Sequence, residues 1–459
     1  MIKISAGEFA KVVSGTLHDI DSKMLITQAP VINSKKAGQD KFFVAFVGSV
    51  VDGHEYVKEA IELGAKFALV TRTVSFPHVL VSDVGQALTD LATYLRNQLP
   101  DLKIVGITGS QGKTTTKEFL NSILTLDGQT IATDGNFNTD IGVPLTLLRC
   151  NESTKHCILE MGARHVGDIA RLTKVAKPNV GVVLVVGTAH LGEFGSVEAI
   201  AKTKSELITN LPEKSTAILG TYDSYTPKMA DSLKLNKILF GQNQMVRAAD
   251  VEIHGGFAHF DLVMPSGRSA VSLQILGEHQ IPNALAAAAA AYALGVPIEV
   301  IAEGLTTAVL DSKWRMQIEN VNGVQIIHDY YNANPESMKA ALKTLTLLTQ
   351  ESGGSSWAIL GKMHELGDLE PEGHQSVTAY SQEIGVDHLV AVATSLYQSN
   401  SNQSFNENMQ QHNCINAQSV LELVNNVSAG DVILLKASRS ERFEELANLI
   451  KDKLNGVSE

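Results

Sequence analysis

The sequence predicts an α/β protein built from about three domains. A length of 459 residues corresponds to about three domains at ~150 residues each. Short apolar segments alternate along the chain with segments of helical periodicity, a pattern typical of mostly parallel sheets. One such pair, an apolar segment over 102–107 and a helical segment over 114–126, is joined by a glycine-containing loop. We therefore expect a small N-terminal α/β domain (1–98), a central domain with a mostly parallel sheet (99–312) and a Rossmann-like C-terminal domain (313–459).

Composition excludes several classes of function. Hydrophobic residues make up 44% of the chain, enough for sizeable cores, and the net charge of −12 argues against a surface for nucleic acid or anionic membrane. The N-terminus lacks the apolar core of a signal peptide, and no apolar run reaches the ~18 residues of a membrane span. Three cysteines without a CxxC pair indicate reduced thiols in a cytosolic protein.

The first domain has few features that point to chemistry. Strands are predicted at 42–47 and 67–70, with a helix at 56–63. A turn of polar and permissive residues, 51–54, lies between the first strand and the helix. On these residues alone, a structural cap is as good an interpretation as a binding domain.

The central domain begins with this glycine-containing loop. The succession of strand, glycine loop and helix start is the arrangement that binds phosphate. Glycines let backbone N–H groups approach an anion, and the start of the following helix adds its positive end. Lys113 would then reach the terminal phosphates, and the Thr114 hydroxyl would lie on Mg²⁺. The usual spacing fails by one residue, because Ile107 stands where the first glycine is expected. The alternative is an ordinary helix start with turn glycines. The loop residues predicted to contact phosphate are Gly109, Ser110, Gln111, Gly112, Lys113, Thr114 and Thr115.

Further strands are predicted at 103–107, 156–160, 180–186 and 216–219. Glu160 ends one of them, and His190 follows another. Since ligands collect at the carboxyl ends of strands in open sheets, both side chains would come near Thr114 and could hold Mg²⁺. The alternative for His190 is a structural role without a ligand. Lys204, on the next predicted helix, would face the same site, and its alternative is a solvated surface position.

The rest of the chain alternates in the same way. Strands and hairpins are predicted over 251–276, followed by a packed alanine-rich helix over 284–294. The C-terminal domain has predicted strands at 324–328, 358–360, 388–393 and 432–435. Pro335 is expected near the first position of a helix.

Four stretches carry a resemblance to a known family. They are TGSQGKTT (108–115), GNFNTDIGVPLTLL (135–148), EMGARHVGDI (160–169) and HDYYNANPESMKAAL (328–342). Together they resemble the Mur ligases, the cytoplasmic amide-forming enzymes of peptidoglycan synthesis, over nearly the whole chain. The second and fourth stretches are most similar to the branch of the family that adds a dipeptide.

The resemblance implies roles for individual residues. In the family the first domain holds the uridine diphosphate of the substrate, the central domain ATP, and the third the incoming dipeptide. Nucleotide contacts would come from the loop together with Asn283, Arg315 and Asp329. Mg²⁺ would be held by Thr114, Glu160, His190 and Lys204, the last if carbamoylated, and the catalytic set would be Lys113, Glu160, His190 and Lys204. Substrate contacts would come from Ser34, Lys35, Asp52, Gly53, His54, Asn136, Asn138, Thr139, Arg164, Asn332, Asn334, Lys436 and Arg439.

The implied reaction is the ATP- and Mg²⁺-dependent joining of D-alanyl-D-alanine to UDP-N-acetylmuramoyl-tripeptide through an acyl phosphate. It would take place in the cytoplasm, on a monomer, with the domains closing to exclude water. Four positions depart from the family pattern: Asn33, Val185, Gln280 and Lys362. These departures are the evidence for one alternative, a non-catalytic ATP-binding switch. The other alternative is another Mur or folylpolyglutamate-type ligase.

Overall fold

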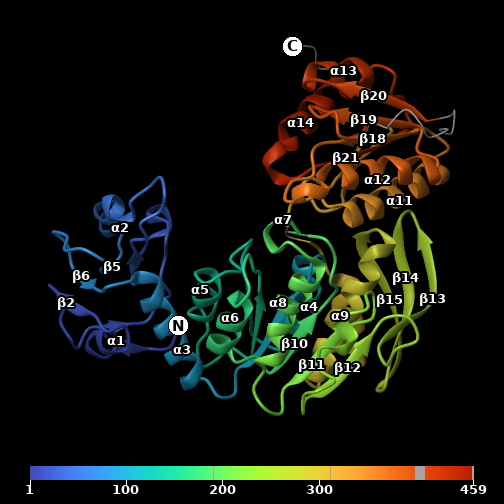
Figure 1. Cartoon of the computed structure of the whole chain (residues 1–459). Coiled ribbons are helices and arrows are strands. Elements are labelled where there is room, and N and C mark those ends of the chain that lie inside the picture. The colour runs from blue at the N-terminus through green and yellow to red at the C-terminus, as the bar shows by residue number, and fades with distance from the viewer. Residues whose placement is uncertain (190, 311, 399–408, 457–459) are drawn as a thin grey trace.

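The computed structural model describes residues 1–189, 191–310, 312–398 and 409–456. The chain forms three successive α/β regions (Figure 1). The N-terminal region lies beside the central one, and the C-terminal region lies over the top of the central region. The predicted α/β class is confirmed. The domain boundaries at 98/99 and 312/313 remain predictions.

The N-terminal region contains a small mixed sheet. Its strand order is β2-β6-β5-β4, with the pairs β6–β5 and β5–β4 parallel and β2–β6 antiparallel. The strand predicted at 67–70 is β5, whereas the one predicted at 42–47 is only two residues long. The elements are β1 (Ile4–Ser5), α1 (Ala6–Val12), β2 (Thr16–His18), β3 (Leu25–Ile26), η1 (Ser34–Lys36), β4 (Phe43–Val44), η2 (Gly53–Tyr56), α2 (Val57–Glu62), β5 (Ala68–Val70), β6 (His78–Leu80) and α3 (Val84–Gln98).

The central region is built on a six-stranded sheet in which every pair of neighbours is parallel. The order is β12-β11-β10-β7-β9-β8, so the chain crosses from one side of β7 to the other between β9 and β10. Such a reversal of strand order is where open α/β sheets bind ligands. The strands are β7 (Lys103–Thr108), β8 (Thr130–Ala132), β9 (His156–Glu160), β10 (Val180–Val183), β11 (Thr216–Gly220) and β12 (Asn236–Phe240).

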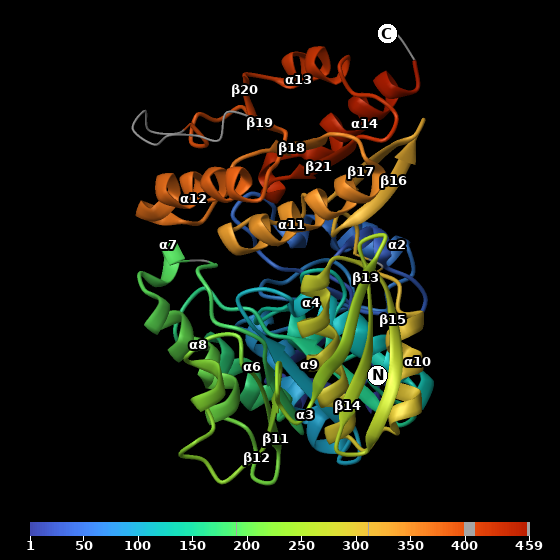
Figure 2. The same cartoon turned by 90° about the vertical axis from the view of Figure 1, so that its right-hand side faces the viewer.

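Helices cover both faces of this sheet. Alternate residues of β7 point to opposite faces, with Ile104 in one apolar cluster and Val105 and Ile107 in the other. The second cluster also takes in the antiparallel sheet β13-β14-β15, which lies beside α9 and α10 (Figure 2). The remaining elements are α4 (Lys113–Asp127), α5 (Gly142–Leu147), α6 (Asp168–Ala176), α7 (Leu191–Phe194), α8 (Val197–Thr209), η3 (Thr226–Lys228), β13 (Arg247–His254), β14 (Phe257–Met264), β15 (Gly267–Leu276), η4 (Glu278–Gln280), α9 (Ile281–Ala293) and α10 (Ile298–Thr307).

The C-terminal region repeats the layered plan. Its sheet has the order β16-β17-β21-β18-β19-β20, parallel except for the β16–β17 hairpin. Helices α11 and α12 pack on the face toward the central region, and α13 and α14 on the other (Figures 1 and 2). The elements are β16 (Gln317–Val321), β17 (Val324–His328), α11 (Pro335–Ser352), β18 (Ser356–Leu360), η5 (Gly367–Leu369), α12 (Glu370–Glu383), β19 (His388–Val392), β20 (Gln410–Cys414), α13 (Ala417–Val424), β21 (Val432–Lys436), η6 (Arg439–Glu441) and α14 (Phe443–Leu454).

The N-terminal and central regions share one apolar core. A single cluster of buried side chains runs from Ile2 and Phe9 through α3 to Ile104 and Leu207. All three cysteines are buried and unpaired, in agreement with the prediction of reduced thiols. Within the described residues, no helix has the length and apolar character needed to cross a bilayer.

Candidate active site

The glycine loop lies where the sheet topology predicts a site. Gly112 caps the N-terminus of α4 with a φ of 82°, a left-handed conformation that glycine adopts without steric cost. A Cβ on Gly112 would lie 2.1 Å from Oδ1 of Asn283, so a side chain is also excluded by space. The Ser110 N–H donates to the Val185 carbonyl at 2.9 Å, which fixes the loop to the end of the neighbouring strand.

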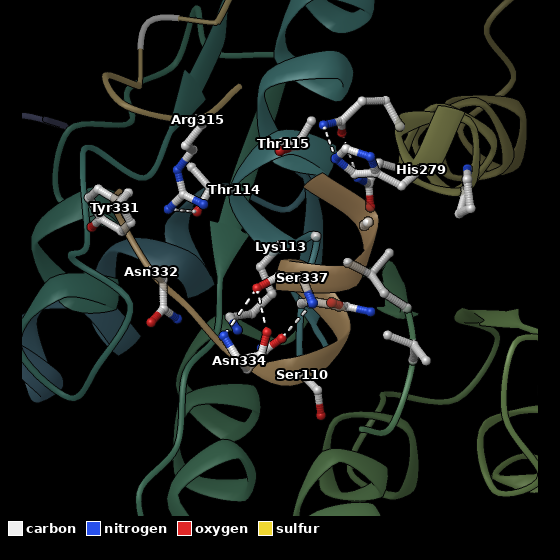
Figure 3. Close-up of a pocket in the computed structure, with 18 of the residues that line it drawn as sticks. Ser110, Lys113, Thr114, Thr115, His279, Arg315, Tyr331, Asn332, Asn334 and Ser337 are labelled. Atoms are coloured by element: carbon white, nitrogen blue, oxygen red, sulfur yellow. Dashed lines mark hydrogen bonds between the residues drawn. The ribbon is translucent and has the colours of Figure 1, made fainter. Parts of the chain in front are cut away.

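A cavity of about 390 Å³ opens above this loop, between the central and C-terminal regions (Figure 3). It contains all but Gly109 of the residues predicted to contact nucleotide: Ser110, Gln111, Gly112, Lys113, Thr114, Thr115, Asn283, Arg315 and Asp329. Five predicted substrate residues line it as well: Asn136, Asn138, Asn332, Asn334 and Lys436. Two segments of sequence more than 100 residues apart therefore meet in one site.

Four side chains form a hydrogen-bonded line across the cavity. Nη2 of Arg315 donates to Oγ1 of Thr114 at 3.1 Å, and that hydroxyl donates to Oε2 of Glu160 at 3.0 Å. The amide of Asn138 donates to the other Glu160 oxygen at 3.0 Å. Figure 3 shows Arg315 and Thr114 pointing toward one another from the two regions. A cation, a hydroxyl and a carboxylate thus converge at the first turn of α4.

Of the two lysines in the predicted catalytic set, Lys113 is half-buried and Lys204 is buried. Lys113 donates to the Gly109 carbonyl at 2.8 Å, and burial lowers its pKa, with Glu160 opposing that shift and Arg315 adding to it. Lys204 lies on α8 with 8% of its surface exposed. Burial lowers its pKa well below the usual range, and the nearby charge of Lys113 lowers it further. Lys204 is therefore not the solvated surface lysine that was the alternative.

His190 lies outside the described residues, so its predicted place beside Thr114 and Glu160 stays a prediction. In the part of the chain that the structure describes, no three histidine, cysteine, aspartate or glutamate side chains form a complete metal site. Thr114 and Glu160 are the members of the predicted metal set that are in direct contact.

The part of the cavity near the start of α9 is organised by amides. Nδ2 of Asn283 donates to Oε1 of Gln280 at 2.9 Å, and the Gln280 amide nitrogen lies 2.9 Å from Nε2 of His279. Burial lowers the pKa of His279 to about 4, so this nitrogen is a lone-pair acceptor at neutral pH. Gln280, one of the departures from the family pattern, thus holds Asn283 in place.

Lys436 lines the same cavity above the glycine loop. Its side chain is 2% exposed, and its Nζ lies 2.5 Å from Oδ2 of Asp329 and 3.0 Å from the Asn332 carbonyl.

Asn334 is the N-cap of α11, where it forms a capping box with Ser337. The asparagine before Pro335 is a sequence signal for this cap. Its side chain has a structural partner even though the residue lines the cavity.

A second, larger cavity of about 770 Å³ lies between the N-terminal region and residues 134–149. Ser34 and Gly53, two of the predicted substrate residues, line it together with Asn33. The basic side chains at its wall are Lys36, Lys41 and Arg149, which the sequence analysis did not select. Lys35, the predicted substrate contact, is exposed and does not line the cavity.

The structure places Asp52 and His54 in the scaffold of the turn instead of at the cavity wall. Nδ1 of His54 lies 2.6 Å from Oδ1 of Asp52, and its Nε2 accepts from the Thr71 N–H at 3.1 Å. Hydrogen bonds from the His54 backbone and side chain lower the pKa of Asp52. A Cβ on Gly53 would lie 2.6 Å from the Phe46 carbonyl, which explains the glycine.

Three further predicted substrate residues line none of the cavities described here. Thr139 and Arg164 are exposed, and the Arg164 N–H donates to Oδ2 of Asp168 at 2.9 Å. Arg439 pairs with both oxygens of Glu444 at 2.8 and 2.9 Å. His374 on α12 is fully buried, with Nε2 accepting from the Met363 N–H and Nδ1 donating to the Glu370 carbonyl.

Comparison with known proteins identifies the family. Residues 107–291 match the Mur ligase middle domain, and residues 314–439 match the Mur ligase, glutamate ligase domain. The chain is 36% identical over 427 residues to the UDP-N-acetylmuramoyl-tripeptide–D-alanyl-D-alanine ligase of Mycobacterium tuberculosis, covering 86% of this chain and 84% of the relative. The chain belongs to the Mur ligase family.

Two solved structures of Mur ligases show the same architecture over nearly the whole chain. MurF from Acinetobacter baumannii superposes with a TM-score of 0.88 at 32% identity, covering 98% of this chain and 99% of that one. MurF ligase from Thermotoga maritima in complex with ADP superposes with a TM-score of 0.80 at 28% identity, covering 94% and 99%. The resemblance to Mur ligases inferred from the four sequence stretches is confirmed.

Proposed function

We propose that the chain is an ATP-dependent ligase that joins D-alanyl-D-alanine to UDP-N-acetylmuramoyl-tripeptide, as a monomer in the cytoplasm. The line of contacts from Arg315 through Thr114 to Glu160 supports this proposal most directly. It brings a cation of the C-terminal region to the phosphate-binding turn of the central region. The same activity is named for the Mycobacterium tuberculosis relative.

The residues present fit a nucleotide with its metal. Nε of Arg315 is buried and, among the described residues, has no hydrogen-bond partner, so it is available to an anion. The Thr114 hydroxyl and the Glu160 carboxylate supply the hard oxygen ligands that Mg²⁺ prefers. When bound there, Mg²⁺ would neutralise charge on the β- and γ-phosphate oxygens.

The first step activates the tripeptide. Joining a carboxylate to an amine is uphill in water, so the terminal carboxylate of the tripeptide first attacks the γ-phosphate of ATP, giving an acyl phosphate and ADP. Lys113 and Arg315 stabilise the negative charge of the transferring group, and the glycine loop orients it through backbone N–H groups. No side-chain nucleophile is required.

The second step forms the amide. The free amine of D-alanyl-D-alanine attacks the acyl carbon, a tetrahedral intermediate forms, and phosphate leaves with the electron pair of the broken C–O bond. Water competes for the acyl phosphate, so the site must be covered. Contacts between the regions, such as Thr188 to Glu336 at 2.9 Å, favour this closure.

The N-terminal cavity suits the uridine diphosphate end of the substrate. Lys36 and Lys41 come from the N-terminal region, and Arg149 from the central region. Arg149 is oriented by Asp134 at 2.7 Å and by the Ala132 carbonyl at 3.2 Å. A guanidinium held in this way can bind a phosphate through two parallel N–H groups.

Carbamoylation of Lys204 is part of the proposal. Reaction with CO₂ requires a neutral amine, and a buried lysine with a lowered pKa supplies one. The resulting carbamate would replace a neutral amine by an anion near the charge of Lys113. This would add an oxygen ligand for a metal ion that the amine cannot provide.

The test is phosphate release from ATP and Mg²⁺, with and without UDP-N-acetylmuramoyl-tripeptide and with and without D-alanyl-D-alanine. We expect release only when both are present, together with the mass of the pentapeptide product. ATP binding without release in any combination would contradict the proposal and favour a non-catalytic switch. Release with a single amino acid in place of the dipeptide would favour another branch of the family.

A further inference from the structure

Arg315 lies on a strained piece of backbone. In the linker 312–316, Trp314 has a φ of 62° and Met316 a φ of 53°. Residues with a Cβ rarely adopt this left-handed conformation, and a bulky side chain does so only where its surroundings hold it there. Strain of this kind on both sides of one residue indicates that the position of Arg315 is fixed by contacts elsewhere.

The side chain of Trp314 is held between two partners. Its ring lies 5.6 Å from the ring of Tyr330 at an angle of 30°, and the guanidinium of Arg439 lies 4.4 Å from its centroid. Arg439 is itself fixed by its double contact with Glu444 at the start of α14. We call Trp314, Tyr330 and Arg439 the clasp.

The backbone of the linker is bound by the C-terminal region as well. The Trp314 carbonyl accepts from the Tyr331 N–H at 3.2 Å, and the Trp314 N–H donates to Oε1 of Gln317 at 2.9 Å. The Met316 N–H donates to Oδ1 of Asp329 at 3.3 Å. The guanidinium of Arg315 then lies 4.0 Å above the Tyr331 ring and contacts Thr114 (Figure 3).

We propose that the clasp positions Arg315 over the phosphate-binding turn, and that Arg439 is a positioning residue and not a ligand of the incoming dipeptide. This inference rests on the proposed function and deepens it. Arg439 lines none of the cavities described here, and both of its terminal nitrogens are engaged by Glu444. A residue that binds the dipeptide carboxylate would instead present those nitrogens to a cavity.

Two substitutions at Arg439 separate the two roles. Lysine keeps the charge but loses the planar fork and most of the stacking, whereas alanine loses all three. For the clasp, we expect both Arg439→Lys and Arg439→Ala to lower kcat/KM for ATP about tenfold, with KM for D-alanyl-D-alanine unchanged. Lys453→Ala, at an exposed position of α14, is the control for the loss of one positive charge.

A carboxylate-binding Arg439 would behave differently. Arg439→Lys would then keep most of the dipeptide affinity, and Arg439→Ala would raise KM for D-alanyl-D-alanine without changing KM for ATP. This pattern would overturn the proposal, as would unchanged kinetics in both variants.

A fluorescence measurement tests the clasp without using ligase activity. The chain has two tryptophans, and Trp357 is 3% exposed, so quenching by acrylamide reports mainly on Trp314. We expect the quenching constant to rise about twofold in Arg439→Lys and Arg439→Ala and to stay unchanged in Lys453→Ala. An unchanged constant would overturn the clasp even if the parent protein proved to be no ligase. Conversely, an inactive parent with the expected quenching would count against the proposed function alone.

Substitution of Trp314 gives an independent check. Trp314→Gly removes the backbone strain together with the ring, whereas Trp314→Phe keeps an aromatic ring between Tyr330 and Arg439. If the clasp positions Arg315, Trp314→Gly loses activity despite the relief of strain, and Trp314→Phe retains most of it. Equal activity of Trp314→Gly and the parent would show that no clasp is needed, and circular dichroism would establish that both variants are folded.

Discussion

The two cavities described above are built in opposite ways. In the cavity above the glycine loop, predicted site residues converge and contact one another, as Arg315, Thr114 and Glu160 do. At the N-terminal cavity the predicted residues Asp52 and His54 bond to each other and stabilise a turn, and other residues form the cavity wall. Chemistry needs fixed distances between reacting groups, whereas recognition of a large substrate can be shared among many weak contacts. We therefore expect substitutions in the first cavity to lower kcat, and those in the second to raise KM.

The largest effect is expected at the phosphate-binding loop. Lys113→Ala removes a cation of the glycine loop that is proposed to stabilise the transferring phosphoryl group, and it should lower kcat about 10³-fold. Steady-state phosphate release measures this. Lys103→Ala, at the exposed start of β7, is the control. A Lys113→Ala enzyme with near-normal kcat and a raised KM for ATP would contradict the expectation that substitutions in this cavity lower kcat.

The second-largest effect on kcat is expected at Lys204. Lys204→Ala is expected to lower kcat about 10²-fold, and acetate or formate at millimolar concentration should restore part of the activity by replacing the carbamate oxygen. The exposed Lys202, two residues earlier on α8, gives the matched control Lys202→Ala. Loss of activity that added carboxylates leave unchanged would count against carbamoylation.

At the N-terminal cavity the effect should appear in binding. Arg149→Ala is expected to raise KM for UDP-N-acetylmuramoyl-tripeptide about tenfold and to leave kcat within about twofold, because it removes a contact equally present in ground and transition states. Lys58→Ala, at an exposed position of α2, is the control. A fall in kcat equal to the fall in kcat/KM would place Arg149 with the chemical residues.

The smallest effect is on stability as a function of pH. Partial burial of the ring lowers the pKa of His279 to about 4 in the folded chain, from its ordinary value of 6.5. Its contribution is complete above pH 6.5 and is lost as pH falls from 6.5 toward 4, by at most about 3 kcal/mol. Urea unfolding at pH 7 and pH 5 should show a smaller difference in His279→Gln than in the parent. His254→Gln, at an exposed position, should match the parent.

The sequence was sufficient for most of the sheet scaffold and for the phosphate-binding loop. β9 and β17 occupy the predicted ranges, and α4 differs by one residue at each end, because buried parallel strands and a loop-capped helix leave strong local patterns. The edge strands β8, β12, β16 and β20 were missed. Of these, β12, β16 and β20 are as long as β9 and β17 but carry more exposed and polar residues, so their apolar signal is weak.

The site was less predictable where contacts join distant segments. Neither the Arg315–Thr114 contact nor the contact of Trp314 with Arg439 follows from local spacing, since each spans more than 100 residues. The buried state of Lys204 is likewise a property of packing, and two lysines on a helix are usually solvated. Asn334 illustrates the reverse case. An asparagine before Pro335 is a local signal for a helix cap, which the structure has, whereas the resemblance implies only a substrate contact.

The apolar core shared by the N-terminal and central regions has a consequence for how the protein melts. One cluster of buried side chains runs from Ile2 through α3 to Leu207, whereas the C-terminal sheet is packed between two separate clusters, to which the central region contributes only Leu276 as a buried member. Segments that share a core lose their stabilising contacts together, and segments that meet mainly through polar contacts separate independently. Differential scanning calorimetry should therefore show two heat-absorption peaks and not three. For purposes of folding, the predicted three-domain chain would then count as two cooperative units.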